Sequence, residues 1–230
     1  MITALAMPAD DEKKKMALEP ILEPLSGPVL AGAIDQLSTI DADIAEAVER
    51  IGYPIPRLRQ PGFATLLQII VAQQVSVQSA AAIFGRLQAA LDGKPTPAGY
   101  LALDDAALRA VGLSRRKVEY GRGLAIALQE GALDLEALKH LSEEEAIKEL
   151  SKLKGFGRWS AEIYLLFALS RADSWPADDL ALQVGMQRLK GLAARPDRKR
   201  MDALAEQWRP LRGCGAILLW HVYGAATLDS

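Results

Sequence analysis

The sequence predicts an all-α protein, and three observations support that prediction. Apolar residues recur at helical spacing in Phe63–Leu91, Arg158–Leu169 and Leu180–Leu189. Ser142, followed three residues later by Glu145, forms a capping box that is typical of a helix N-terminus. No segment of the chain is rich in the residues and alternation that strands require. We therefore expect helices joined by glycine and proline turns.

Composition limits the function classes without selecting one. The chain has 230 residues, of which 50% are hydrophobic, so it can bury a large core. Lysine and arginine number 27 against 29 acidic residues, which gives a net charge of −2. A nucleic-acid partner would therefore have to be attracted by a local basic face rather than by the charge of the whole protein.

Cysteine and histidine are too few for the common metal and disulfide frameworks. Cys214 is the only cysteine, which excludes a disulfide framework, a four-cysteine zinc site and a four-cysteine iron–sulfur cluster within one chain. His140 and His221 are the only histidines, which argues against transition-metal catalysis. The chain has neither an apolar run of about 18 residues nor a signal-peptide pattern. We expect a cytoplasmic protein that uses no cofactor and does not contact a membrane.

The beginning of the chain differs in character from the rest. Residues 1–27 mix charges with prolines and predict a loosely ordered arm, whereas residues 28–230 predict one helical domain. Within that domain, Phe63–Leu91 predicts a long helix whose apolar stripe is interrupted by Gln73, Gln74 and Ser76. These polar residues either hydrogen-bond within the protein or bind a partner.

A basic helix start lies further along the chain. Arg115, Arg116 and Lys117 follow Gly112 and Ser114 at the beginning of a predicted helix that continues through Leu128. Three cations at a helix N-terminus oppose the helix dipole, so they require either solvent or an anion. A phosphate would suit them, and a solvated basic turn is the alternative.

The stretch from residue 153 to residue 182 combines two further devices. Gly155 and Gly157 flank Phe156, and such a turn allows positive φ and directs backbone N–H groups outward at the start of the next helix. This is either a seat for an anion or an ordinary turn between helices. Downstream, Asp178 and Asp179 form a carboxylate pair at the N-terminus of a second helix.

These segments resemble a known family. LKGFGRWSA is similar to the hairpin, and WPADDLALQVGMQRL to the catalytic aspartate segment, of the helix–hairpin–helix base-excision DNA glycosylases. The resemblance is strongest to their alkylpurine branch, the 3-methyladenine DNA glycosylase II family, and extends from about Phe63 to Tyr223. It implies two helical lobes with the hairpin and Asp179 at the cleft between them. The implied partner is double-stranded DNA that contains alkylated bases, and we expect a monomer.

The resemblance also assigns residues to the DNA interface. The residues implied to contact DNA are Gln73, Gln74, Ser76, Arg115, Arg116, Lys117, Lys154, Gly155, Gly157 and Arg158. In the family, a bulky apolar residue at the place of Gln74 is wedged into the duplex, so this chain departs from the pattern there. A glutamine can still fill the gap left by a flipped base. The resemblance further implies a monovalent cation that bridges the hairpin and the phosphate.

The reaction implied for this branch needs one carboxylate. Consecutive helical residues point about 100° apart, so Asp178 and Asp179 cannot act as a convergent pair on one glycosidic bond. An N-alkylated purine already carries positive charge and leaves as a neutral base, which removes the need for a strong general acid. Asp179 matches the catalytic aspartate of the family and Asp178 a neighbouring cap. The alternative for both residues is a helix N-cap.

Aromatic residues are implied to form the base pocket. Trp159 occupies the place where a second class of glycosylases carries a Schiff-base lysine, so the resemblance implies base release without strand cleavage. Tyr164 is a further pocket candidate, although Ile163 holds the aligned place. Trp175 and Trp220 line the pocket or belong to the core. The competing functions are a non-enzymatic helix–hairpin–helix DNA-binding module and a glycosylase for another damaged or mismatched base.

Overall fold

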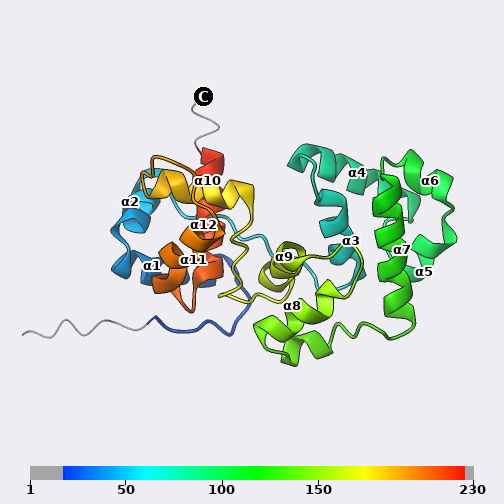
Figure 1. Ribbon diagram of the computed structural model, residues 1–230, viewed down its shortest axis with the longest axis horizontal. Coiled ribbons are helices and arrows are strands. Elements are labelled where there is room, and N and C mark those ends of the chain that lie inside the picture. Colours follow the sequence, from blue (N-terminus) through cyan, green and yellow to red (C-terminus); the bar gives the residue numbers. More distant parts are fainter. Residues whose placement is uncertain (1–17, 226–230) are drawn as a thin grey trace, which may run out of the picture.

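The computed structural model describes residues 18–225, and all regular structure in that range is helical (Figure 1). The predicted all-α fold is confirmed. The helices are α1 (Gly27–Ile40), α2 (Ala42–Ile51), α3 (Phe63–Ala72), α4 (Val77–Ala90), α5 (Pro97–Ala102), α6 (Asp105–Ala110), α7 (Arg115–Gln129), α8 (Glu143–Ser151), α9 (Arg158–Ala168), α10 (Leu180–Leu189), α11 (Arg198–Ala205) and α12 (Arg212–Ala225), with 3-10 turns at Ala137–His140 and Glu206–Trp208. None of these helices has the length and apolar character needed to cross a bilayer.

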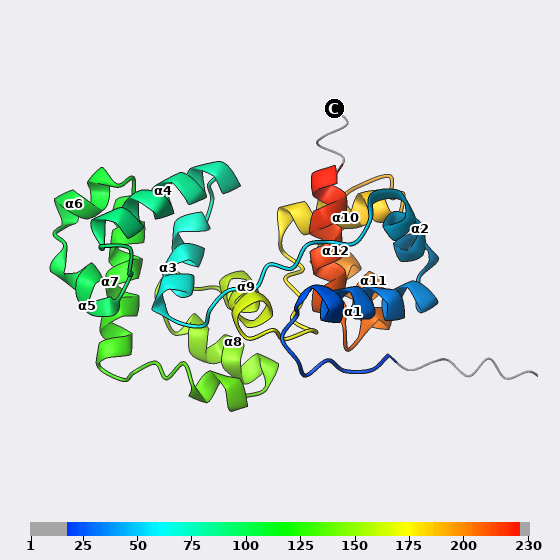
Figure 2. The same ribbon diagram turned by 180° about the vertical axis from the view of Figure 1, so that it is seen from behind.

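The helices form two lobes, as the resemblance implied. One lobe contains α1, α2, α10, α11 and α12, and the other contains α3 to α9 (Figure 1). The first lobe is therefore built from both ends of the described chain. The chain crosses between the lobes twice, once through residues 52–62, shown in cyan in Figure 2, and once through residues 169–179.

Helix α9 is the buried centre of its lobe. Every residue from Ser160 to Ala168 is buried, and the helix packs against α3 and α8. Its last turn also contacts the other lobe, because the rings of Phe167 and Trp220 lie 5.4 Å apart between centroids. The N-terminus of α9, which begins directly after the glycine hairpin, is therefore fixed by the packing of the whole helix.

The second crossing segment is anchored at several points before it reaches Asp179. The Gly213 N–H donates to the Ala172 carbonyl over 2.7 Å, and the Arg212 guanidinium pairs with Asp173 at 2.7 Å. The Ser174 hydroxyl donates to the carbonyl of Glu162 in α9 over 3.1 Å. Because both lobes hold this segment, the residue at its end has a defined position relative to the hairpin.

Two boundaries expected from the sequence differ from those of the structure. The single long helix predicted for Phe63–Leu91 is wrong, because Gln74 has a φ of 56° and Ser76 caps a new helix, α4, with its hydroxyl. The break produces a loop, residues 73–76, between α3 and α4. Of the predicted N-terminal arm, residues 1–17 lie outside the described range. Residues 18–26 contain no helix, and Leu25 among them is buried.

Candidate active site in the cleft between the lobes

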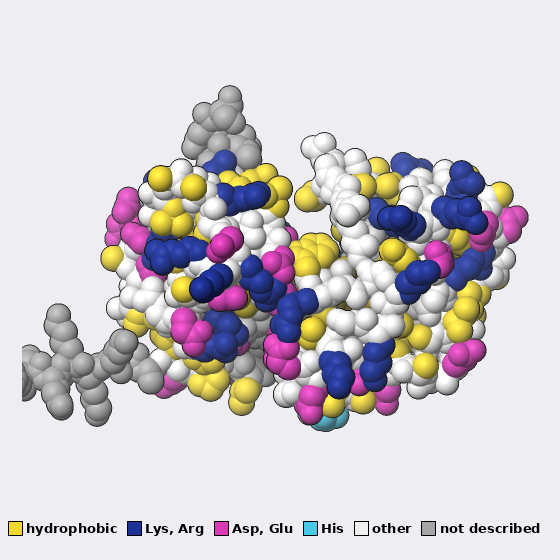
Figure 3. All heavy atoms as spheres, viewed as in Figure 1, with side chains coloured by type: hydrophobic (Ala, Val, Ile, Leu, Met, Phe, Trp, Pro, Cys, Tyr) yellow, Lys and Arg dark blue, Asp and Glu magenta, His cyan; other side chains and the backbone are white. Residues whose placement is uncertain are grey.

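A cleft of about 700 Å³ separates the two lobes. Figure 3 shows the hollow, with apolar side chains at its base and lysine and arginine side chains on both lobes. Its walls come from four stretches of the sequence, and each stretch contains one of the motifs described above. The lining residues are Gln73, Gln74, Ser114, Arg116, Lys117, Tyr120, Gly155, Gly157, Trp159, Ser160, Asp178, Asp179 and Leu180.

Asp179 is the most constrained side chain of the cleft. Its Oδ1 accepts hydrogen bonds from the Leu182 N–H at 2.9 Å and from the Trp220 indole N–H at 3.0 Å. Its Oδ2 accepts one from the Trp159 indole N–H, also at 3.0 Å. A carboxylate ion only accepts hydrogen bonds, so three N–H donors suit its charged form and fix its orientation. The result is an oriented anion at the wall of the cleft.

The predicted division of labour between the two aspartates is wrong in one respect. Asp179, rather than Asp178, is the N-cap of α10, because its side chain accepts from the backbone N–H of Leu182. Asp178 instead forms an ion pair with Arg198 of α11. The capping geometry arises because a residue at the N-cap position presents its carboxylate to the N–H groups of the first turn. Asp179 therefore caps α10 and also lines the cleft.

The hairpin faces the cleft on the opposite lobe. Gly155 has a φ of 89°, and a Cβ at this position would lie 2.2 Å from the ring of Tyr120. Gly157 has a φ of −101° and would meet nothing within 4 Å. The expectation of positive φ thus applies to Gly155 alone. Gly157 is the N-cap of α9 and provides no side-chain cap, which leaves the first-turn N–H groups of α9 directed to the cleft.

The two glutamines have different environments. The Gln73 side-chain amide donates to the Gly155 carbonyl at 2.8 Å and to the Ser160 hydroxyl at 3.1 Å, so it connects the 73–76 loop to the hairpin. For Gln73 the internal hydrogen-bonding interpretation is confirmed. Gln74 is exposed at the rim of the cleft, and Ser76 uses its hydroxyl to cap α4. Of the three polar residues of this loop, Gln74 is therefore the one placed to meet a partner in the cleft.

The predicted basic helix start lies beside the hairpin. Arg115 and Arg116 are exposed at the N-terminus of α7, and Arg116 lines the cleft. Lys117 donates from Nζ to the Val71 carbonyl at 2.8 Å, and partial burial lowers the pKa of its ammonium group. Lys117 therefore stabilises the last turn of α3, while the two arginines remain available to an anion.

Two cations of the central stretch are engaged by acidic side chains. Lys154 pairs with Glu119 at 2.5 Å, and this hydrogen bond raises the pKa of the lysine. Arg158 pairs with Glu144 of α8 and lies 3.4 Å from Glu162, and the Glu144 carboxylate raises the pKa of the guanidinium. Neither residue lines the cleft. The expected contact of Lys154 and Arg158 with DNA stays a prediction, and it would require these ion pairs to open or to be shared with a phosphate.

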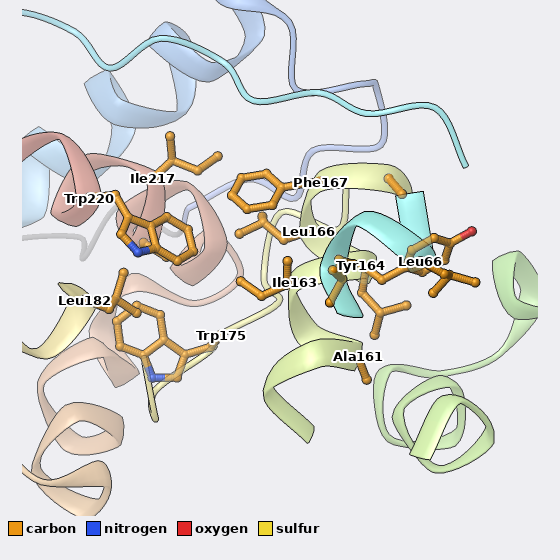
Figure 4. Packing of buried hydrophobic residues seen from close by; sticks show 14 of the residues in the cluster. Leu66, Ala161, Ile163, Tyr164, Leu166, Phe167, Trp175, Leu182, Ile217 and Trp220 are labelled. Atoms are coloured by element: carbon orange, nitrogen blue, oxygen red, sulfur yellow. The ribbon is translucent and has the colours of Figure 1, made fainter. Parts of the chain in front are cut away.

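Trp159 lines the cleft and Trp220 contacts the site through the hydrogen bond from its indole N–H to Asp179, whereas Tyr164 and Trp175 do neither. Tyr164 is fully buried, and its hydroxyl accepts from the Gly62 N–H at 3.1 Å. Figure 4 shows Tyr164 on the side of α9 toward Leu66, while Ile163 points toward Trp175. The 100° between consecutive helical positions accounts for this difference. The prediction that Tyr164 lines the pocket is wrong.

Trp175 is a core residue. It is 4% exposed and packs edge to face on Trp208, with ring centroids 5.9 Å apart. It does not line the cleft. The core alternative is therefore the correct one for Trp175.

Arg57 is a residue of the site that sequence analysis did not assign. Its guanidinium lies over the Trp220 ring, 5.8 Å from the centroid. Burial lowers the pKa of Arg57, and the charge of Asp179 opposes that effect, which places the two groups within electrostatic reach. The only feature of the sequence that could have drawn attention to Arg57 was its position in a proline-rich linker. Nothing in the local pattern indicated that the linker returns to Trp220.

The hairpin carbonyls are the groups that could hold a cation. The Leu153 carbonyl accepts from the Phe156 N–H at 3.0 Å, and the Gly155 carbonyl accepts from Gln73. Each oxygen keeps a second lone pair for a hard cation, and the monovalent cation implied by the resemblance stays a prediction. Within residues 18–225, no cluster of histidine, cysteine and acidic side chains fits a metal ion.

An array of backbone donors that faces the oriented Asp179 carboxylate suits a class of protein that binds a phosphate backbone and carries a reactive group at one point. Comparison with known proteins agrees with this class. Residues 67–210 match the family described as HhH-GPD superfamily base excision DNA repair protein. The chain belongs to this superfamily.

Individual relatives are similar over most of the chain. DNA-3-methyladenine glycosylase 1 of Schizosaccharomyces pombe is 32% identical, over 80% of this chain and 83% of its own length. DNA-3-methyladenine glycosylase 2 of Escherichia coli is 30% identical, over 88% of this chain and 74% of its own length. A solved structure of the S. pombe 3-methyladenine DNA glycosylase in complex with abasic DNA superposes with a TM-score of 0.77, at 32% identity, over 82% of this chain and 95% of that one.

Proposed function

We propose that this protein is a monofunctional DNA glycosylase that hydrolyses the N-glycosidic bond of alkylated purines, such as 3-methyladenine, in duplex DNA. The damaged nucleotide is flipped out of the duplex and its base enters the cleft. The Asp179 carboxylate stabilises the positive charge that develops at C1′ as the base departs and orients the attacking water. The base leaves neutral, and an abasic site remains.

The observation that carries this proposal is the arrangement around Asp179. Two indole N–H groups, from Trp159 on one lobe and Trp220 on the other, hold the carboxylate across the base of the cleft. Because this anion is already oriented before the substrate arrives, little reorganisation energy is required when the cationic transition state forms. The names of the relatives support the choice of alkylated purines as substrates.

The aromatic surroundings favour a cationic base over a neutral one. An indole face attracts a cationic ring by about 0.5–2 kcal/mol more than a neutral ring, which corresponds to a preference of about two- to thirtyfold. The weaker glycosidic bonds of alkylated purines add to that preference. We expect 3-methyladenine to be released well, 7-methylguanine less well, and uracil or 8-oxoguanine poorly.

The test is base release from alkylated duplex DNA by the purified chain. The expected result is free 3-methyladenine and an intact strand that breaks only after alkali treatment. Efficient release of uracil together with inert 3-methyladenine would contradict the alkylpurine assignment. The monomeric state and the cytoplasmic location stay predictions.

The competing function is a DNA-binding module without catalysis, in which Asp179 is only a helix cap. Its specific support is the N-cap geometry of Asp179 on α10. Base release by the wild-type chain would exclude this module, and Asp179→Ser then tests whether the carboxylate or only the cap is needed, because serine is an effective N-cap but has no carboxylate. Lost base release with an unchanged melting temperature and unchanged duplex affinity supports catalysis. Base release at the wild-type rate would leave Asp179 as a cap alone.

A further inference from the structure

A second acidic side chain lies behind the cleft, in a separate cavity of about 290 Å³. This cavity lies among α8, α9, α11 and the start of α12, and arginine and acidic side chains line it. Three buried polar atoms of its lining have no hydrogen-bond partner within the described residues, namely Glu143 Oε1, Glu162 Oε2 and Trp175 Nε1. Buried polar atoms are normally paired, so this cavity departs from the general rule.

Glu162 is the most buried acid of this cavity. It lies in α9 and is 2% exposed. Its Oε1 is 3.4 Å from Arg158 Nη1 and 3.7 Å from Arg198 Nη2, while its Oε2 has no partner among residues 18–225. Burial raises the pKa of Glu162 to about 7, against the opposing effect of the two arginines. The side chain is thus incompletely paired.

Stability alone gives no reason for this arrangement. Buried ion pairs contribute little to folding, because desolvation offsets the attraction, and an apolar residue of similar volume is often as good or better. The geometry of Glu162 is poorer than that of a saturated pair, with both arginine contacts beyond 3.2 Å. A buried, incompletely paired acid of this kind is a candidate for a functional role.

A chain of charged contacts leads from Glu162 to the cleft. Arg198, which lies 3.7 Å from Glu162, also forms an ion pair with Asp178. Asp178 directly precedes Asp179, whose carboxylate is held by the two indoles. The Glu162 carboxylate, the Arg198 guanidinium and the Asp178 carboxylate thus alternate in sign from the cavity to the residue beside the proposed catalytic group.

We propose that Glu162 is a positioning residue for Asp179 and acts through Arg198 and Asp178. When Glu162 is ionised, it attracts the Arg198 guanidinium and holds it where it can fix Asp178 at the start of α10. When Glu162 is neutral, Arg198 loses one of its anchors, and the backbone around Asp179 relaxes. The catalytic consequence rests on the proposed function, whereas the effect on the placement of Asp179 does not.

The relay makes the site sensitive to pH near neutrality. Arg198 of α11 and Arg158 of α9 favour the ionised form of Glu162, and Asp178 opposes it. The other charged residues of the same cavity are Glu143 and Glu144 of α8, Asp202 of α11, Glu206 of the 3-10 turn, Arg209 and Arg212. Asp202 also lies 3.7 Å from Arg198. Because burial raises the pKa of Glu162, the ionised and positioning form is populated above about pH 7 and is lost as the pH falls.

The placement can be measured without any substrate. The indole N–H signals of Trp159 and Trp220 in a ¹H–¹⁵N spectrum report their hydrogen bonds to Asp179, and Trp→Phe variants assign them. We expect both signals to shift between pH 6 and 8 in the wild-type protein. In Glu162→Gln both signals should be displaced and no longer depend on pH in this range. Unchanged indole signals in this variant would overturn the proposal.

Two further variants control for damage to the fold. Glu143→Gln alters another incompletely paired acid of the same cavity, but one whose partner is Arg171 rather than Arg198. It should leave the indole signals and their pH dependence as in the wild type. Arg198→Gln interrupts the relay from a side chain that is 37% exposed, and it should displace the two signals as Glu162→Gln does. A displacement in Glu143→Gln that equals that in Glu162→Gln would refute the relay.

Single-turnover excision then tests the catalytic consequence. Glu162→Gln should reduce the rate at pH 8 roughly tenfold, since small misplacements of catalytic groups are costly, while duplex affinity stays unchanged. Asp178→Asn and Glu162→Gln should not be additive if both act on one relay. Indole signals that respond in a protein without any glycosylase activity would support the relay and refute the proposed function. A wild-type rate and pH profile in an active Glu162→Gln enzyme would refute the positioning role.

Discussion

The two walls of the cleft have opposite electrostatic character. The hairpin wall offers backbone N–H groups at the start of α9, and side-chain cations such as Arg116 stand near them. The opposite wall presents the oriented carboxylate of Asp179, whose three hydrogen bonds all come from N–H donors. The first wall is suited to an anion that arrives from outside, and the second to a cation that forms there.

This contrast between the walls explains how a weakly acidic protein can act on DNA. Contacts to phosphate through backbone groups need little net positive charge and carry no sequence information. Specificity is left to the Asp179 carboxylate and to the two indoles that hold it, Trp220 from the lobe of Asp179 and Trp159 from the first turn of α9 beside the hairpin. Substitutions in the two walls should therefore change different measured quantities, namely affinity for any duplex on the hairpin wall and rate on the Asp179 wall.

The largest expected effect is on the rate, from Asp179→Asn. Asparagine keeps the shape and can keep the N-cap through its one amide oxygen, but it loses the acceptor for the Trp159 N–H and the charge that stabilises the transition state, so excision should fall at least roughly a hundredfold. Single-turnover assays measure the rate, and a titration with duplex DNA should give the wild-type affinity. Base release near the wild-type rate would remove Asp179 from the mechanism.

The next largest effect is expected from substitutions of Trp159, whose aromatic face and indole N–H can be tested separately. Trp159→Phe keeps an aromatic face but loses the N–H that holds Asp179 Oδ2, whereas Trp159→Ala loses both. We expect Trp159→Ala to lose the preference of about two- to thirtyfold for a cationic base, as the ratio of 3-methyladenine to neutral-base release shows. Trp159→Phe should slow all substrates alike. Equal ratios in the two variants would show that the ring face does not select the base.

A smaller effect is expected on the hairpin wall, from Gly157→Val. A Cβ at this position meets nothing within 4 Å and the φ of −101° suits any residue, so the fold should be retained. The side chain would occupy the approach to the α9 N–H groups and weaken binding to every duplex by roughly tenfold, the equivalent of about 1.4 kcal/mol. Fluorescence anisotropy with damaged and undamaged duplexes measures this. A loss confined to one lesion would contradict the division between the walls.

Gly155 provides the contrast that makes the Gly157 experiment informative. Gly155 has a φ of 89°, and the Cβ of an alanine there would lie 2.2 Å from the Tyr120 ring, so Gly155→Ala should destabilise the fold itself. Its melting temperature should fall, whereas that of Gly157→Val should not. The two glycines of one turn thus separate a folding requirement from a binding requirement.

The sequence predicted the helices and the position of Asp179 better than it predicted the directions of side chains. Helix α10 was expected at Leu180–Leu189 and is found there, because an N-cap and an apolar period are local features. The break at Gln74 was missed, because a positive φ is uncommon outside glycine and the neighbouring Gln73 is held by a tertiary hydrogen bond to the hairpin. Local patterns contain no information about that contact.

Non-local pairing accounts for what else the sequence left undetermined at the site. Arg158 turns to Glu144, 14 residues earlier, and Asp178 turns to Arg198, 20 residues later. Trp220 reaches Asp179 across 41 residues of sequence. Each partner is chosen by how the lobes pack, so composition and spacing could nominate these residues but could not assign their partners.

No effect is expected in a test for covalent chemistry on the hairpin side of the cleft. A lyase needs an unprotonated amine near C1′, and Trp159 occupies the place where related lyases carry their lysine. Lys154 is a poor substitute, because its pairing with Glu119 raises its pKa and keeps it protonated. Lys117 is the one lysine that lines the cleft among the described residues, and burial lowers its pKa, but its Nζ is engaged by the Val71 carbonyl.

Borohydride should therefore trap no enzyme–DNA adduct, and the strand should stay intact until alkali is added. An adduct that persists in Lys154→Met but disappears in Lys117→Met would identify Lys117 as a nucleophile and would move part of the chemistry to the hairpin wall.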